Sequence, residues 1–259
     1  MDFDFLITKE QVAEIKKNTI GVVCSNKCNG AGVVVEKVNK GIQFNDCTCV
    51  KEFIWNTKLV MANVPIKHWD FSLRNLLKKF IDDNNTALAL LKGYAEQADK
   101  MVKEGVGIYL QGSYGLAKTA LASYICREFI KADKSVYFIR MSHLTKLLFE
   151  SLKDEMLLQK LNWIRKEVQL LVIDEIEKDY KIDNVHSFSG VQISDIFDDF
   201  YETKKCLVVT ANVPKLELGK VHSKNVVDRI QELVDIPLVG ESYRGKADKK
   251  SLILEGMRK

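Results

Sequence analysis

The chain has 259 residues, of which 46% are hydrophobic and 29% are charged, with only 14 Gly and 3 Pro. This ordinary globular composition excludes collagen-like and largely disordered chains. The formal net charge of +4 excludes binding of nucleic acid through bulk charge, so any contact with DNA must be local. Because the sequence has no apolar run long enough to span a membrane and no signal-peptide pattern, we expect a soluble intracellular protein with reduced cysteines.

Four of the six cysteines lie close together near the N-terminus and predict a separate small module. Cys24 and Cys28 precede, and Cys47 and Cys49 follow, the segment GAGVVVEKVNKGIQF, which has the pattern of a β-hairpin with its turn at 39–41. A hairpin brings both cysteine pairs together at its base, and four thiolates suit a tetrahedral structural zinc site. Neither spacing is the commonest zinc-ribbon form, so the alternative is four reduced cysteines that are neighbours by chance.

The next segments are helical in pattern. Pro65 breaks any helix that continues out of the cysteine module, so we place the end of that module at residue 60. A helical linker is expected over 61–104, because RNLLKKFIDD and NTALALLKGYAEQADKMVKE have helical spacing of their apolar residues.

From residue 105 to residue 259 the chain alternates short apolar runs with amphipathic helices. The expected strands are GIYLQ (107–111), SVYFIR (135–140), LLVIDE (170–175) and CLVVTAN (206–212). Alternation of this kind is typical of a parallel sheet covered by helices on both faces. We therefore expect an α/β fold in the larger part of the chain.

The segment after the first of these strands predicts a phosphate-binding loop that opens into a helix. It comprises Gly112, Ser113, Tyr114, Gly115, Leu116, Ala117, Lys118 and Thr119. Such a loop needs small residues whose backbone N–H groups surround phosphate oxygens, a Lys for the β- and γ-phosphates and a hydroxyl for Mg²⁺. Ala117 stands where the motif has Gly, and the loop survives this change if φ there is negative. The alternative is a strand-to-helix turn whose small residues serve packing alone.

Polar residues at the ends of two later strands fit a nucleotide site. Asp174 follows an apolar strand and, with Thr119, can hold Mg²⁺. The adjacent Glu175 can orient or deprotonate an attacking water. Asn212 ends the last expected strand and can reach the γ-phosphate or the water, although a turn former before Pro214 is the alternative. The sequence thus predicts binding and hydrolysis of a nucleoside triphosphate.

Two arginines are further candidates. Arg229 lies in a helix after the last expected strand, from which it can reach the γ-phosphate of a neighbouring subunit. Arg244 follows a turn and can contact the nucleotide of its own chain or face nucleic acid. A solvated surface charge is the alternative for each.

These motifs together resemble the DnaC/DnaI group of AAA+ helicase loaders, some of them encoded by phages, to which the IstB transposition ATPases are related. The resemblance covers residues 20–245. It is carried by the sequence Cys-x₃-Cys-Asn-Gly-x-Gly, then a Cys-x-Cys, then NVPIKHWDFSL, and by the stretches GIYLQGSYGLAKTALASYI, LLVIDEIE, CLVVTANVP and KNVVDRI. It implies ATP as the nucleotide and assigns the following roles: Walker A for Lys118 and Thr119, Walker B for Asp174 and Glu175, sensor 1 for Asn212, and an arginine finger acting in trans for Arg229.

The resemblance also implies a function. By this resemblance, the protein would be an ATP-dependent loader that delivers a replicative hexameric helicase onto single-stranded DNA, in the cytoplasm of a bacterial or phage-infected cell. The module at 1–60 would bind the helicase, and the AAA+ domain at 105–259 would self-associate. Two alternatives stay open: an IstB-like helper ATPase of transposition, which the cysteine module disfavours, and a nucleotide-binding adaptor with little turnover, which Ala117 favours.

Overall fold

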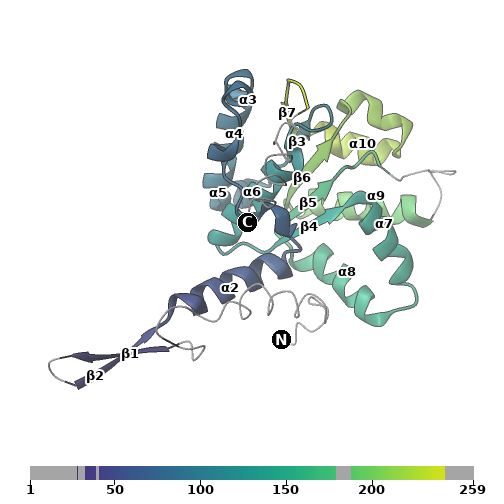
Figure 1. Ribbon diagram of the computed structural model, residues 1–259. Coiled ribbons are helices and arrows are strands. Elements are labelled where there is room, and N and C mark those ends of the chain that lie inside the picture. Colours follow the sequence, from purple (N-terminus) through teal and green to yellow (C-terminus); the bar gives the residue numbers. More distant parts are fainter. Residues whose placement is uncertain (1–27, 29–32, 39–40, 179–187, 243–259) are drawn as a thin grey trace, which may run out of the picture.

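The structure, a computed structural model, describes Cys28 and residues 33–38, 41–178 and 188–242 (Figure 1). At its centre, apolar runs of the sequence form a five-stranded sheet in the order β4-β5-β6-β3-β7, in which all neighbouring strands are parallel. The strands are β3 (Ile108–Gln111), β4 (Val136–Arg140), β5 (Leu170–Asp174), β6 (Cys206–Ala211) and β7 (Val234–Pro237). The predicted α/β fold with a parallel sheet is confirmed.

Helices cover both faces of the sheet, because side chains alternate along each strand (Figure 1). In β3, for example, Ile108 and Leu110 belong to one buried cluster and Tyr109 to the other. The first face packs against α2 (Thr48–Met61), α3 (Lys78–Asp83), α4 (Asn85–Glu96), α5 (Ala98–Glu104) and α6 (Lys118–Lys131). The second face packs against α7 (Met141–Glu150), α8 (Glu155–Glu167), α9 (Phe188–Glu202) and α10 (Lys224–Gln231).

Strand β7 was not expected from the sequence, which places the last strand at 206–212. It is a four-residue edge strand, and Val234 is 45% exposed, so it lacks the continuous apolar run of a central strand. Its presence corrects the expected position of Arg229, since α10 precedes the last strand instead of following it.

The helical segment at 61–104 is part of the larger core. Leu59 of α2, Leu91 of α4 and Leu121 of α6 share one buried cluster, and α2 continues to Met61. The side chain of Asn84 binds the backbone of the distant residue Val239 through two hydrogen bonds. Asn84 Nδ2 donates to the Val239 carbonyl oxygen at 2.9 Å, and Asn84 Oδ1 accepts from the Val239 N–H at 2.8 Å. The division at residues 60 and 104 stays a prediction, but these contacts join the helical segment to the core and to the residues that follow β7.

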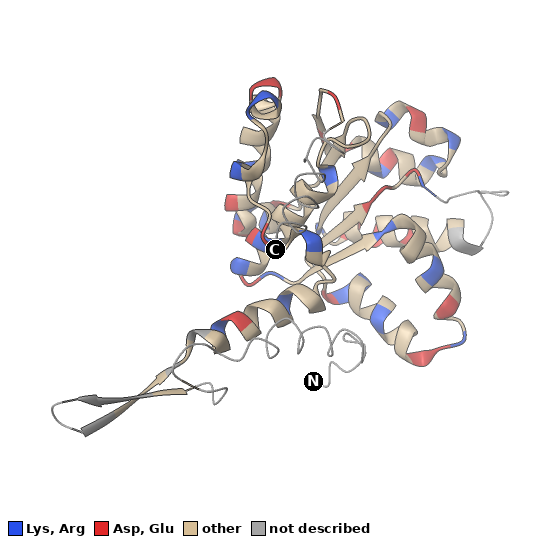
Figure 2. Cartoon of the chain, viewed as in Figure 1, with Lys and Arg blue, Asp and Glu red and all other residues tan. Residues whose placement is uncertain are grey.

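The described residues also form three short 3₁₀ helices: η1 (Ile66–His68), η2 (Leu73–Asn75) and η3 (Lys215–Lys220). None of the helices in the described part of the chain is long and apolar enough to cross a membrane. Figure 2 shows Lys and Arg interspersed with Asp and Glu along the helices, as expected for a chain of small net charge.

The predicted hairpin near the N-terminus is confirmed. Strands β1 (Val33–Val38) and β2 (Gly41–Asp46) pair antiparallel, with Val33 opposite Asp46 and Val38 opposite Gly41. The hairpin extends away from the body of the molecule, beyond the start of α2 (Figure 1). The first two residues of the predicted turn, 39 and 40, lie outside the described residues.

Candidate nucleotide-binding site

The predicted phosphate loop joins the end of β3 to the start of α6, and a cavity of about 240 Å³ lies over it. Its lining includes the loop residues from Gly115 onward, the first turn of α6, Glu175 and Asn212. Because the N-terminus of a 14-residue helix carries free N–H groups and the positive end of the helix dipole, this cavity suits an anion. Lys67 and His68 of η1 line the same cavity.

Three residues of the loop have positive φ. Gly112 has φ of 153° and Gly115 has φ of 85°, and a Cβ at Gly115 would overlap the side chain of Ser242. Glycine is therefore required at both positions. Ala117, the N-cap of α6, has φ of 55°. The condition set for the loop, a negative φ at Ala117, is therefore not met, because the turn into α6 has a left-handed residue there; the loop nevertheless keeps the backbone N–H of Ala117.

Two other loop side chains have contacts outside the phosphate site. Leu116 is only 1% exposed and its side chain belongs to the hydrophobic core, so Leu116 itself can offer only its backbone to a phosphate. Tyr114 is 53% exposed, and its ring faces the ammonium group of Lys178 at 5.5 Å. Ser113 is exposed, and its carbonyl accepts a hydrogen bond from Lys118.

Lys118 and Asn212, predicted to be the Walker A lysine and the sensor 1 asparagine, are in direct contact. The buried Lys118 donates through Nζ to the carbonyl oxygens of Gly112 and Ser113, at 2.6 and 2.8 Å. The same ammonium group donates to Oδ1 of Asn212 at 2.8 Å. Two predicted site residues that are far apart in the sequence are thus brought together, because β3 and β6 are neighbours in the sheet.

Asp174 and Thr119 form an oxygen-rich corner beside this lysine. The Thr119 hydroxyl donates to Asp174 Oδ1 at 3.1 Å, and the Thr210 hydroxyl donates to the same oxygen at 2.6 Å. Asp174 is 1% exposed, and burial raises the pKa of its carboxyl group, against the effect of these hydrogen bonds. Adjacent hydroxyl and carboxylate oxygens are the ligands that Mg²⁺ prefers, so the predicted pair fits this metal.

Glu175 lines the cavity from the end of β5. Its backbone has φ of 57°, and its N–H donates to the Thr210 hydroxyl at 3.0 Å. One carboxylate oxygen, Oε1, accepts from Lys178 Nζ at 2.8 Å, and this contact raises the pKa of Lys178. Thr210 therefore holds both Asp174 and Glu175, the predicted Walker B pair, through hydrogen bonds.

A third acidic residue at the site, Glu177, was not singled out from the sequence. Glu177 Oε1 accepts a hydrogen bond from Asn212 Nδ2, and Glu177 Oε2 is buried without a hydrogen-bond partner among the described residues. The available signal was its position two residues after Glu175, where the chain leaves the sheet at the same edge. The site thus holds three acidic side chains, Asp174, Glu175 and Glu177.

With this geometry in view, similarity to known proteins decides the family. A model of the family described as IstB-like ATP binding protein matches residues 94–251, more than half of the chain. The chain belongs to this family. The resemblance expected from the motifs is confirmed, since IstB-like proteins and the DnaC/DnaI loaders are the relatives that the motifs implied.

The IstB-like chain is also similar to helicase loaders. It is 31% identical over 86 residues to the replicative helicase loader DnaI of Bacillus subtilis strain 168, a match that covers 33% of this chain and 26% of that protein. The chain therefore matches about a quarter of the length of this curated relative. The structure of the DnaC helicase loader matches 68% of this chain and 100% of its own, with a TM-score of 0.55 and 21% identity. The structure of DnaI matches 68% of this chain and 94% of its own, with a TM-score of 0.55 and 22% identity. At these identities the similarity to both structures is one of fold.

In this IstB-like protein the candidate arginine finger is engaged within its own chain. Arg229 Nε donates to Asp198 Oδ1 at 2.8 Å, and the guanidinium lies 4.1 Å from the centre of the Tyr201 ring. It borders a second cavity, of about 570 Å³, which is also lined by Gly107, directly before β3, and by Leu207, near the start of β6. Arg229 therefore lies at the opposite edge of the sheet from the phosphate loop of the same chain. Arg244 lies outside the described residues.

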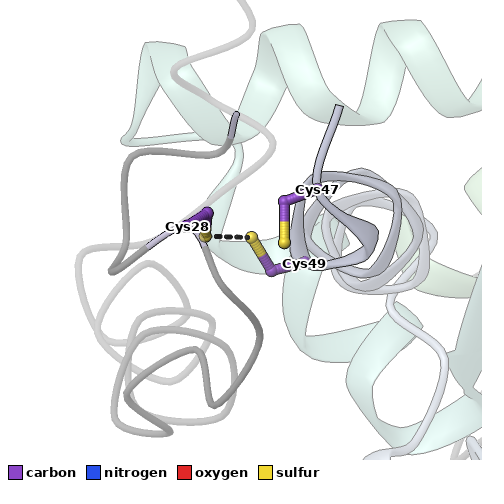
Figure 3. A group of neighbouring side chains, drawn as sticks. All are labelled: Cys28, Cys47 and Cys49. Atoms are coloured by element: carbon purple, nitrogen blue, oxygen red, sulfur yellow. Dashed lines mark hydrogen bonds between the residues drawn. The ribbon is translucent and has the colours of Figure 1, made fainter. Parts of the chain in front are cut away.

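Three of the four predicted zinc ligands converge where the hairpin meets α2. The sulfur atoms of Cys28, Cys47 and Cys49 all lie within 4.8 Å of one another, and those of Cys28 and Cys49 are 3.6 Å apart (Figure 3). Two thiolates on one tetrahedral zinc ion are about 3.8 Å apart, so this group fits zinc. The fourth predicted ligand, Cys24, lies outside the described residues.

The remaining two cysteines have a packing role. Cys126 and Cys206 are fully buried in the core between α6 and the sheet. Burial raises the pKa of the Cys206 thiol to about 11 and that of the Cys126 thiol higher still. Both thiols are therefore inert packing groups at neutral pH.

Proposed function

We propose that this protein is an ATP-dependent loader that delivers a replicative hexameric helicase onto single-stranded DNA. The observation that carries the proposal is the contact of Lys118 with Asn212, beside the paired Thr119 and Asp174, at the N-terminus of α6. This arrangement supports ATP as the ligand, and the similarity to DnaI supports a helicase as the partner.

The site residues have distinct tasks in the proposed hydrolysis. Backbone N–H groups of 112–118 and the Lys118 ammonium hold the phosphates. Thr119 and Asp174 would hold Mg²⁺, which neutralises charge on the phosphate oxygens. Glu175 orients a water and accepts its proton as the water oxygen attacks the γ-phosphorus, and the bond to the bridging oxygen of ADP breaks. Asn212 donates a hydrogen bond to the γ-phosphate.

The remaining features would serve assembly. Self-association of AAA+ domains would bring Arg229 to the γ-phosphate of a neighbouring subunit, once it exchanges Asp198 for phosphate. The four cysteines, with Cys24 as the fourth ligand, would hold a structural zinc ion and so stabilise the small module that binds the helicase. This division of labour couples ATP turnover to association, because each active site then needs two subunits.

The test combines hydrolysis with partner capture. The wild-type protein should hydrolyse ATP in the presence of Mg²⁺, and K118A should not. Used as bait in lysate of the source cell, the wild-type chain should recover a hexameric replicative helicase, and added ATP should change the recovered amount. K118A is the matched control, and its recovery should not respond to ATP. Recovery of a transposase in place of a helicase would contradict the loader function.

A second candidate is a helper ATPase of transposition, and the IstB-like family match favours it. The converging cysteines at the hairpin favour the loader instead, because they supply a separate module for a protein partner. A third candidate is an adaptor that binds nucleotide without turnover. Nucleotide binding with no detectable hydrolysis by the wild-type chain, together with recovery of a replication protein, would establish it.

A further inference from the structure

Glu177 contacts Asn212, a residue that lines the cavity and also contacts Lys118. Its Oε1 accepts from Asn212 Nδ2, while Asn212 Oδ1 accepts from Lys118 Nζ at 2.8 Å. We propose that Glu177 is a positioning residue that orients the side-chain amide of Asn212 toward the γ-phosphate. The inference rests on the proposed ATP-dependent function and adds a residue to its site.

The two contacts determine which way the Asn212 amide points. An ammonium group can only donate hydrogen bonds, and a carboxylate can only accept them. The amide must therefore turn its oxygen to Lys118 and its nitrogen to Glu177. The nitrogen carries two hydrogens, so one N–H binds Glu177 and the other is left for a ligand in the cavity that Asn212 lines.

Glu177 becomes more important when nucleotide is bound. The Lys118 ammonium that holds Oδ1 of Asn212 is the group that contacts the β- and γ-phosphates of a bound nucleotide. Once Lys118 turns to the phosphates, Asn212 loses its contact with Lys118 and keeps its hydrogen bond to Glu177. An amide with one fixed N–H presents the second N–H in one direction, which lowers the entropy cost of binding the γ-phosphate.

The surroundings of Glu177 argue against a role in stability alone. Lys178, the next residue, pairs with Glu175 instead of Glu177, and Oε2 of Glu177 is buried without a hydrogen-bond partner among the residues described. A buried carboxylate oxygen without a partner costs free energy. A residue that lowers stability at the edge of a binding cavity is typical of a functional site.

The test is a double-mutant cycle with E177A, N212A and the double variant, read as the ratio of the dissociation constants for ADP and a non-hydrolysable ATP analogue. Loss of one charge-assisted hydrogen bond should lower the preference for the triphosphate about tenfold in E177A. N212A should lose at least as much, and the double variant should match N212A, since Glu177 acts through Asn212. E177Q retains an acceptor oxygen and should keep most of the preference. Glu217, which forms an exposed ion pair with Lys220, supplies the control, and E217A should behave as wild type.

The outcomes separate this inference from the proposed function. An unchanged nucleotide preference in E177A, or effects that add in the double variant, would overturn the role of Glu177 while wild-type hydrolysis leaves the ATPase function intact. Equal loss of ADP and triphosphate binding in E177A and E177Q would mean a structural role only, and so overturns it too. A wild-type chain that binds no nucleotide would refute both the inference and the proposed function.

Discussion

Replacement of Ala117 by Gly tests the backbone conformation at the start of α6. An Ala residue at φ of 55° is strained by about 1–2 kcal/mol relative to Gly. The A117G variant loses about 0.7 kcal/mol because its unfolded chain is more flexible, within the usual range for such changes. It loses a further roughly 0.4 kcal/mol because the methyl group is half-buried. The expected net change is therefore a stabilisation of about 0.4 kcal/mol.

Ala132 provides a matched control, because it ends the same helix, is equally half-buried and has φ of −84°. A132G removes no strain, so it should destabilise the fold by about 1.1 kcal/mol, the sum of the two losses. The two variants should thus differ by about 1.5 kcal/mol in urea unfolding followed by circular dichroism. ATP affinity of A117G should change less than about threefold, because the loop N–H groups are retained. If A117G is destabilised as much as A132G, the left-handed conformation is wrong.

Three other predictions concern the acidic corner, the cysteines and the arginine. Because burial raises the pKa of Asp174, its ionisation lowers stability as the pH rises through that pKa. D174N should therefore raise the melting temperature at pH 7, by less as the pH falls through the raised pKa, and abolish Mg²⁺-dependent hydrolysis; an unchanged melting temperature would count against the burial argument. Metal analysis should find one zinc ion per chain, lost in C49S but kept in C126A, and chelation should reduce the far-UV circular dichroism. R229A and K118A should each be inactive, yet a mixture of the two should regain hydrolysis. In the mixture, the R229A subunit supplies the intact phosphate loop and the neighbouring K118A subunit supplies the arginine. An inactive mixture would mean that Arg229 only forms the ion pair with Asp198 of α9.

The sheet and most of the site could be predicted because they depend on local patterns. Central strands buried on both faces require continuous apolar runs, and the runs at 107–111, 135–140, 170–175 and 206–212 match the observed strands to within one residue at each end. Parallel strands align their carboxyl ends, so a motif after β3 and polar residues after β5 and β6 had to meet.

The features that could not be predicted depend on tertiary contacts. The φ of Ala117 follows from how the loop closes between β3 and α6, with Gly112 against Leu238 and Gly115 against Ser242. These contacts join segments more than 100 residues apart, and no local pattern reports them. Glu177 was missed because its partner, Asn212, is a neighbour only through the pairing of β5 with β6.

Backbone strain and hydrogen bonding are linked at this site through Thr210. The buried Thr210 hydroxyl donates to Asp174 and accepts from the N–H of Glu175, the residue with φ of 57°. A positive φ at a non-glycine residue costs free energy and persists only where the surroundings hold it. Here the left-handed turn ends β5 directly after Asp174, so Asp174 stays buried against Thr119 while Glu175 reaches the cavity. Adjacent carboxylates in an ordinary strand would point to opposite faces of the sheet, and the strained turn is what lets both serve one site.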